Sequence, residues 1–171
     1  MSCSKATGRA IYAIRKQDPC ARAKLWTTLA HIVSEPRIFR LDLTVAEEDI
    51  DDLGHASNIA FVRWIQRIAI AHSEAVGLGL ETYRRLGGVF VVARHEIDYL
   101  RPALRGDLLQ ARTWISSVMA AKVQRSTELV RASDGEPVAR SLTSWGWVEM
   151  ASGRPRRIPH EVLVAFEHDV H

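Results

Sequence analysis

From residue 37 onward, hydrophobic and polar side chains follow regular periods, whereas residues 1–36 show no clear period. Residues 37–47 alternate, with one side of the segment made of Ile38, Arg40 and Asp42 and the other of Phe39, Leu41, Leu43 and Val45. A period of two predicts a strand that is buried on one face. The first regular element is therefore expected to be a half-buried β-strand.

Residues 58–76 repeat their hydrophobic positions every three to four residues, which predicts a long helix. Its main stripe includes Phe61, Trp64 and Ile68. The other faces also carry hydrophobic side chains: Ile59, Val62, Ala69 and Ile70. A helix that is apolar nearly all round has to be covered on several sides, so this one is expected to lie at the centre of the fold.

The remainder of the chain is dominated by predicted strands. After a short polar segment and two glycines, four stretches fit this description: residues 89–100, 107–119, 122–132 and 138–150. Ser133-Asp134-Gly135-Glu136 is a strong hairpin signal between the last two. Residues 159–168 begin with proline and are expected to form a terminal helix.

One strand, one long helix and four consecutive antiparallel strands predict a single α+β domain spanning residues 37–171. A sheet of about five strands has one face to hide, and only the long helix is apolar enough to cover it. We therefore expect a curved antiparallel sheet wrapped around one central helix. Such a protomer leaves an edge strand unprotected, so we expect it to pair with further copies as a homodimer or homotetramer.

The basic residues are concentrated near the N-terminus. Residues 1–40 contain eight lysines and arginines but only two acidic residues, a net charge of +6, whereas the whole chain has +3 and residues 41–171 therefore have −3. No recognition-helix or zinc-finger pattern accompanies this charge, so nucleic-acid binding is not expected. Residues 1–36 are predicted to be a basic N-terminal extension, with a targeting presequence as the alternative.

Apolar runs and cysteines also limit the function. No run approaches the roughly 18–20 apolar residues that a membrane span needs. The only cysteines are Cys3 and Cys20, which support neither a disulfide framework nor a zinc site and fit a reducing compartment. We therefore expect a soluble, cytoplasmic protein.

One dense polar cluster directly precedes the long helix and consists of Asp49, Asp51, Asp52, His55, Ser57 and Asn58. Sequence signatures of serine hydrolases, P-loop proteins, zinc peptidases and dinucleotide-binding proteins are absent. The segment opens like a calcium-binding EF-hand loop, but Leu53 and Ala60 stand where that loop needs oxygen ligands. The cluster is therefore a candidate active site without a metal.

Helix capping is the simpler explanation of the cluster. Ser57 or Asn58 would serve as N-cap, and acidic groups are favoured near a helix N-terminus. Capping accounts for only one or two of the six polar residues. Alternatively, free N–H groups at the start of the helix form an oxyanion site, beside which a carboxylate acts as general base or nucleophile. Such a site can hydrolyse a thioester without a serine triad, because thioesters need less activation than amides.

These residues resemble the hotdog-fold thioesterases, namely the 4-hydroxybenzoyl-CoA thioesterase and acyl-CoA thioester hydrolase family and the related acyl-carrier-protein thioesterases. Those families share a turn of the form D-x-D-x-x-G or D-x-D-x-N-x-H-V-N-N, followed by Y-x-x-W on the helix. Here residues 49–58 read D-I-D-D-L-G-H-A-S-N, and Phe61 and Trp64 follow. Residues 91–102 (V-V-A-R-H-E-I-D-Y-L-R-P) also resemble their second strand, so that the resemblance covers residues 37–166.

The resemblance implies the hotdog fold and hydrolysis of an acyl-CoA or acyl-carrier-protein thioester, with no cofactor. Asp51, the second aspartate of the pair, matches the catalytic carboxylate. Asn58, seven residues later, matches the position whose backbone N–H forms the oxyanion site. His55 matches the histidine of the longer motif and is expected to position or assist water.

Further candidates lie outside the turn. Arg154, Arg156 and Arg157 could bind the phosphates of coenzyme A or of a carrier's phosphopantetheine, since guanidinium binds phosphate bidentately. A solvated tail is an equally good explanation of this group. His72 lies on the apolar stripe of the helix and is expected to be a core histidine.

Two other functions fit the same fold. One is hydration or dehydration of an acyl thioester, although those relatives carry a D-x-N-x-x-H pattern and Leu53 takes the asparagine position here. The other is a non-catalytic module that binds acyl thioesters. An intact Asp51 beside an oxyanion site favours hydrolysis over both.

Overall fold

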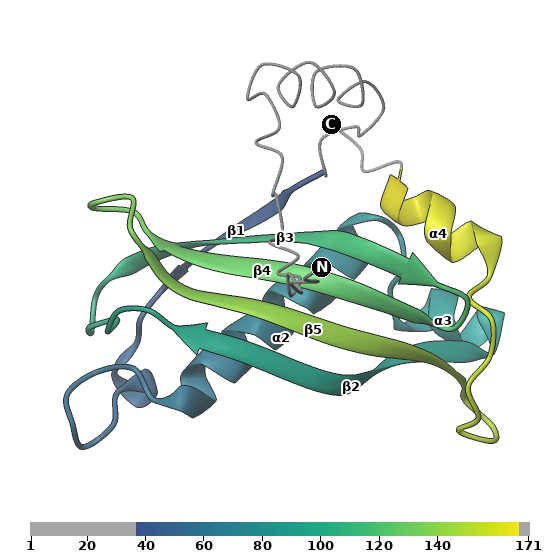
Figure 1. The fold of residues 1–171 in the computed structure, drawn as a ribbon, viewed down its shortest axis with the longest axis horizontal. Helices are drawn as coiled ribbons and strands as arrows, with labels where there is room; N and C mark the ends of the chain where they lie inside the picture. Colours follow the sequence, from purple (N-terminus) through teal and green to yellow (C-terminus); the bar gives the residue numbers. More distant parts are fainter. Residues whose placement is uncertain (1–36, 168–171) are drawn as a thin grey trace, which may run out of the picture. The chain divides into compact units, whose positions relative to one another are not determined.

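One antiparallel sheet with the strand order β1-β3-β4-β5-β2 dominates the computed structural model, which describes residues 37–167 (Figure 1). The strands are β1 (Phe39–Thr44), β2 (Gly88–Tyr99), β3 (Leu108–Met119), β4 (Lys122–Arg131) and β5 (Pro137–Glu149). The helices are η1 (Glu47–Asp49), α2 (Asn58–Ala75), α3 (Leu80–Leu86) and α4 (His160–Glu167). The five predicted strands and both predicted helices are confirmed in this order, and η1 and α3 are additional elements. The predicted extension, residues 1–36, lies outside the described residues.

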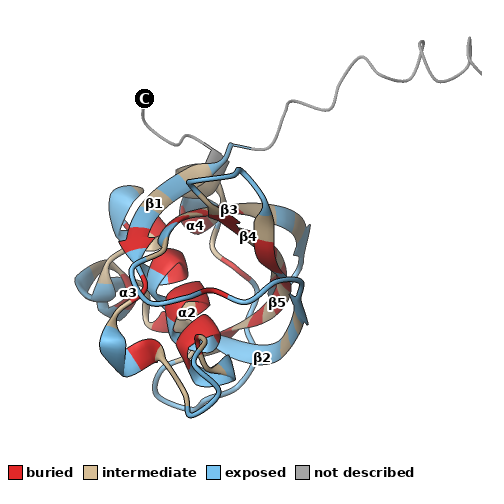
Figure 2. Cartoon of the chain, turned by 90° about the vertical axis from the view of Figure 1, so that its left-hand side faces the viewer, coloured by how far each residue is buried: buried red, intermediate tan, exposed pale blue. Residues whose placement is uncertain are grey.

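The sheet curves around α2, which Figure 2 shows end-on. Every second side chain of β4 is buried on the face that covers the helix, including Val123, Thr127 and Leu129. Phe61 and Ile68 of α2 are buried against this face. The predicted curved sheet around one central helix is therefore confirmed.

The core has two parts along α2. The first surrounds the N-terminal half of the helix, where Phe61, Trp64 and Ile68 pack with β1, β3 and β5. The second lies at the other end, where Tyr83 of α3, Val162 of α4 and Trp147 of β5 pack together. The sequence pattern predicts only a short polar segment where α3 forms. Its one buried side chain, Tyr83, connects it to the second cluster.

Gly88, the first residue of β2, lies against the indole of Trp147. A Cβ added to Gly88 would stand 2.6 Å from Trp147 Cε2, closer than real Cβ contacts allow. The indole is completely buried between Tyr83 and Phe90, whose ring centroids are 5.7 and 5.0 Å away. Glycine is therefore required at this position by the close approach of the indole.

One stripe of α2 is not covered within the described protomer. Ile59 is 72% exposed, Val62 is 37% exposed and Ile70 is 49% exposed. The sheet curves around only part of the circumference of α2, so this apolar side of the helix stays exposed in a single protomer. No helix within residues 37–167 is long and apolar enough to cross a membrane.

Candidate active site

Asp49 connects the polar turn, residues 49–58, to α2. Its carboxylate is 6% exposed, accepts a hydrogen bond from the Ala46 N–H at 3.0 Å and pairs with the guanidinium of Arg63. Its carbonyl oxygen accepts the Ser57 N–H at 2.8 Å. All these contacts lie within the fold, so the first aspartate of the turn has a positioning role.

Asp51 lies in the turn that follows. The turn closes through the Gly54 N–H, which donates to the Asp51 carbonyl at 2.9 Å while Gly54 adopts a φ of 80°. One carboxylate oxygen of Asp51 accepts the Leu53 N–H at 2.9 Å and lies 3.7 Å from Nδ1 of His55. The Asp51 side chain is 33% exposed. Its carboxylate is thus oriented by backbone and open to solvent.

The start of α2 supplies hydrogen-bond donors. Ser57 is the N-cap, and its hydroxyl accepts the Ala60 N–H at 3.2 Å. The N–H groups of Asn58 and Ile59 have no acceptor among residues 37–167. Such free N–H groups, with the helix dipole behind them, stabilise negative charge on an oxygen atom. Capping by Ser57 thus leaves the Asn58 and Ile59 N–H groups available to a ligand oxygen.

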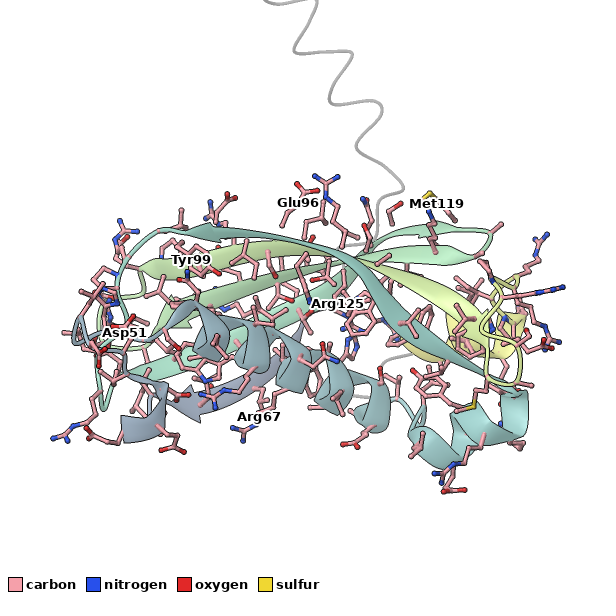
Figure 3. The ribbon with its side chains drawn as sticks, turned by 90° about the horizontal axis from the view of Figure 1, so that it is seen from below. Asp51, Arg67, Glu96, Tyr99, Met119 and Arg125 are labelled. Atoms are coloured by element: carbon pink, nitrogen blue, oxygen red, sulfur yellow. The ribbon has the colours of Figure 1, made fainter. Side chains whose placement is uncertain are left out.

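Three predicted site residues, Asp51, His55 and Asn58, belong to one short segment that leads into α2. Figure 3 labels Asp51 near the N-terminal end of this helix. The Asp51 N–H donates to the His55 carbonyl at 3.0 Å, and the Ala56 N–H donates to the Ala103 carbonyl at 2.8 Å. The segment is thereby tied to the loop after β2. Asn58, the first residue of α2, is exposed.

The predicted arginines lie at the other end of the sheet. The Glu149 N–H donates to the Arg154 carbonyl and the Arg156 N–H to the Trp147 carbonyl, so this loop lies beside the end of β5 that pairs with Gly88. The turn carrying Asp51 adjoins the opposite end of β2. The eleven steps of β2 between Gly88 and Tyr99 correspond to about 36 Å. Within one protomer, Arg154, Arg156 and Arg157 therefore lie far from Asp51.

The sequence pattern does not reveal two side-chain contacts. Tyr99, at the end of β2, packs edge-on against Phe61 with ring centroids 5.2 Å apart, near the start of α2. The second feature is Arg125, which is 4% exposed, and one guanidinium nitrogen lies 2.7 Å from Nδ1 of His72. His72 is a core histidine as predicted, 1% exposed. The signal for Arg125 was its inward position in the β4 alternation, where a charge is unusual.

A cavity of about 260 Å³ lies beside the C-terminal half of α2. Its walls come from α2, α3, α4 and all strands except β1, and include Ile70, Tyr83, Phe90, Arg125 and Trp145. Burial raises the pKa of the Tyr83 hydroxyl, while its hydrogen bond with Ser73 and the charge of Arg125 act in the opposite direction. Within residues 37–167, no group of three or more His, Cys, Asp or Glu side chains could hold a metal ion.

Known proteins resemble this chain in sequence and in fold. The sequence profile of a family described as the thioesterase-like superfamily matches residues 45–166. A chloroplastic palmitoyl-acyl carrier protein thioesterase of Cuphea hookeriana is 23% identical over 140 residues, which are 78% of this chain and 34% of that protein. The chain thus spans about a third of the length of the curated relatives it matches.

Two solved structures show the same fold. A 1,4-dihydroxy-2-naphthoyl-CoA thioesterase from Synechocystis superposes with a TM-score of 0.70 at 19% identity, covering 76% of this chain and 96% of that one. A Staphylococcus aureus protein in complex with CoA has a TM-score of 0.73 at 16% identity, covering 80% and 85%. At these identities the likeness shows the fold alone, and the hotdog fold expected from the sequence is confirmed.

Proposed function

The chain belongs to the thioesterase-like superfamily, and from that premise we propose that it hydrolyses an acyl thioester of coenzyme A or acyl carrier protein to a free acid and a thiol. The observation that carries the proposal is the occurrence of two features in one short segment: an oriented, solvent-accessible Asp51 carboxylate and the free N–H groups that begin α2. The names of the relatives support both carriers, because one acts on a naphthoyl-CoA and another on acyl carrier protein.

The first requirement of the reaction is charge stabilisation at the thioester carbonyl. Attack on the carbonyl carbon moves an electron pair onto its oxygen. The Asn58 N–H donates to that oxygen in the proposed complex, and the N-terminal end of the helix dipole favours the negative charge. This interaction strengthens as the charge develops, so it lowers the barrier more than it tightens substrate binding.

The second requirement is a nucleophile. In the proposed step Asp51 takes a proton from water, the hydroxide adds to the carbonyl carbon, and the carbon–sulfur bond breaks as the oxyanion collapses. The departing thiolate receives the proton. Direct attack by Asp51 would instead form an anhydride that water then hydrolyses. His55, 3.7 Å from the carboxylate, is proposed to orient the water.

A second copy of the chain is proposed to complete the site. In the described part of the chain β2 pairs with β5 on one side only, and Val91 and Val92 are exposed along it. An open strand edge favours pairing with another strand. Antiparallel pairing of two β2 strands about a two-fold axis would bring residues 154–157 of one copy to the Asp51 end of the other. The three arginines could then meet the phosphates of the carrier.

The test is a thiol-release assay on aliphatic and aromatic acyl-CoA substrates and on acyl carrier protein. The wild-type protein is expected to release thiol, and Asp51→Asn to lower kcat at least about a hundredfold. Asp52→Asn is the matched control, since Asp52 is the exposed neighbour of Asp51 and its variant is expected to retain activity.

Other outcomes would overturn the proposal. Hydration of crotonyl-CoA without thiol release would indicate a hydratase. Tight binding of acyl-CoA without turnover, unchanged in Asp51→Asn, would indicate a binding module. Thiol release that survives Asp51→Asn would remove Asp51 from the mechanism.

A further inference from the structure

Arg125 is a buried cation in a wall that is otherwise mostly apolar. It extends inward from the central strand β4 and is 4% exposed. Figure 3 shows it between α2 and the sheet, away from Asp51. The proposed hydrolysis assigns no role to this guanidinium, which lines the cavity beside α2.

The guanidinium is held in a defined orientation. Its Nη1 lies 2.7 Å from His72 Nδ1 and 3.5 Å from Thr113 Oγ1, and the Phe166 ring lies below it with 5.4 Å between Cζ and the ring centroid. Because guanidinium only donates, His72 Nδ1 must accept and therefore carries no proton. Thr113 is itself fixed by its bond to the Ser126 carbonyl at 2.8 Å. These contacts preorganise the cation in the cavity wall.

A second donor lies in the same wall. Tyr83 is 8% exposed, and its hydroxyl interacts with Ser73, another residue lining the cavity. The remaining walls are largely hydrophobic, including Ile70, Phe90 and Trp145. A largely apolar cavity with a few fixed polar groups is the usual form of a small-molecule site, in which the polar groups select the ligand.

The open stripe of α2 extends from the start of the helix towards this cavity. Ile59 and Val62 follow Asn58 along the exposed face, and Gln66 and Ile70 on the same face line the cavity. From Asn58 to Gln66 the helix advances about 12 Å, and from Asn58 to Ser73 about 22 Å. An extended alkyl chain advances somewhat less than one bond length of about 1.5 Å per carbon, so about ten to sixteen carbons span this distance.

We propose that this cavity binds the distal end of the acyl group and that Arg125 selects acyl groups whose distal end carries an oxygen atom. This inference rests on the proposed thioester hydrolysis. A hydroxyl, keto or carboxylate oxygen accepts hydrogen bonds from the guanidinium and the Tyr83 hydroxyl. A terminal methyl group at the same place accepts no hydrogen bond from either side chain. Arg125 and Tyr83 are specificity-determining residues on this proposal, and Asp51 and Asn58 remain the reactive pair.

The experiment compares acyl-CoA substrates of equal length, about ten to sixteen carbons, that end in methyl, hydroxyl or carboxyl. Wild-type kcat/KM is expected to favour an oxygen-bearing end about tenfold or more at the best length. Arg125→Met is expected to remove this preference, so that the ratio of kcat/KM values becomes about one. A merely structural role would lower turnover of all substrates together and leave the ratio unchanged. The hydroxyl and carboxyl substrates distinguish recognition of an oxygen from recognition of a negative charge.

Two further variants keep the test decisive. Arg140→Met is the matched control, since Arg140 lies on the adjacent strand β5 on the outer face of the sheet and pairs with Glu128. It is expected to retain the ratio. Tyr83→Phe removes one hydroxyl and is expected to reduce the ratio severalfold, which provides a result if Arg125→Met does not fold.

A binding experiment separates this inference from the proposed hydrolysis. Decanedioic, hydroxydecanoic and decanoic acids are titrated into Asp51→Asn protein and followed by the fluorescence of Trp145 and its neighbours or by calorimetry. Tighter binding of the oxygen-bearing acids that is lost in Asp51→Asn/Arg125→Met supports the subsite, even if no thioester is hydrolysed. Equal binding of all three acids, or a preference that survives Arg125→Met, overturns it.

Discussion

The Asp49 carboxylate pairs with the Arg63 guanidinium and thereby joins the polar turn to the second turn of α2. The same carboxylate caps the Ala46 N–H. Asp49→Ala is expected to lower the free energy of unfolding by about 2 kcal/mol, because hydrogen bonds to a charged group are lost and their partners remain. Urea denaturation measures the change. The matched control, Asp52→Ala, is expected to change stability by less than about 0.5 kcal/mol.

Replacement of Asn58 by proline isolates its N–H group. Proline fits the first position of a helix, and Ser57 before it already has the extended conformation, φ −67° and ψ 155°, that a residue preceding proline prefers. Asn58→Pro is therefore expected to fold normally but to lower kcat for thiol release about 10²- to 10³-fold. Asn58→Ala keeps the N–H and is expected to remain active. Equal activity of the two variants would place the oxyanion site elsewhere.

A charge on the open edge of β2 is expected to weaken self-association. Val92→Lys would place an ammonium group where a second copy's β2 is proposed to pair, and edge lysines oppose such pairing. Sedimentation velocity is expected to show a shift from oligomer to monomer. Val118→Lys, at the exposed end of β3, is the control that should leave the sedimentation coefficient unchanged. A wild-type monomer would contradict the proposed pairing.

His95 on β2 gives a pH dependence with a defined sign. Burial lowers the pKa of this histidine below its ordinary 6.5, and its Nδ1 lies 2.9 Å from the Thr143 hydroxyl. The unfolded chain therefore binds the proton more readily than the folded one, so acid favours unfolding. The contribution of His95 to stability is complete above about pH 7 and declines as the pH falls through 6.5 towards the folded pKa.

The check is the difference between wild type and His95→Gln in denaturant titrations at several pH values. Wild type is expected to lose more stability than the variant between about pH 7 and pH 5. Parallel curves would show that His95 does not contribute.

The elements and the turn could be predicted from the sequence because each leaves a local period or motif. Alternation marks β1, the three-to-four-residue repeat marks α2, and the spacing from Asp51 to Asn58 marks the candidate site. The Ser57 cap, too, follows from residue type and position. These features depend on neighbours that are close along the chain.

The remaining features depend on contacts between distant segments. The exposure of Ile59 follows from how far the sheet curves, which no local period encodes. The separation of Arg154 from Asp51 follows from strand order, since β5 returns to the far end of α2. Arg125 was visible as a charge at an inward position, but its partner His72 comes from a different element 53 residues away. Pairing of this kind is decided by tertiary packing.

The contact between Gly88 and Trp147 constrains how this sequence can evolve. Any side chain at position 88 requires a smaller residue at position 147, while a reduction of Trp147 alone leaves a cavity between Tyr83 and Phe90. The two positions can therefore change only together or in a strict order, with the indole lost before the glycine. Among relatives of this chain, a residue other than glycine at the start of β2 is expected to occur only where the matching β5 residue is smaller than tryptophan.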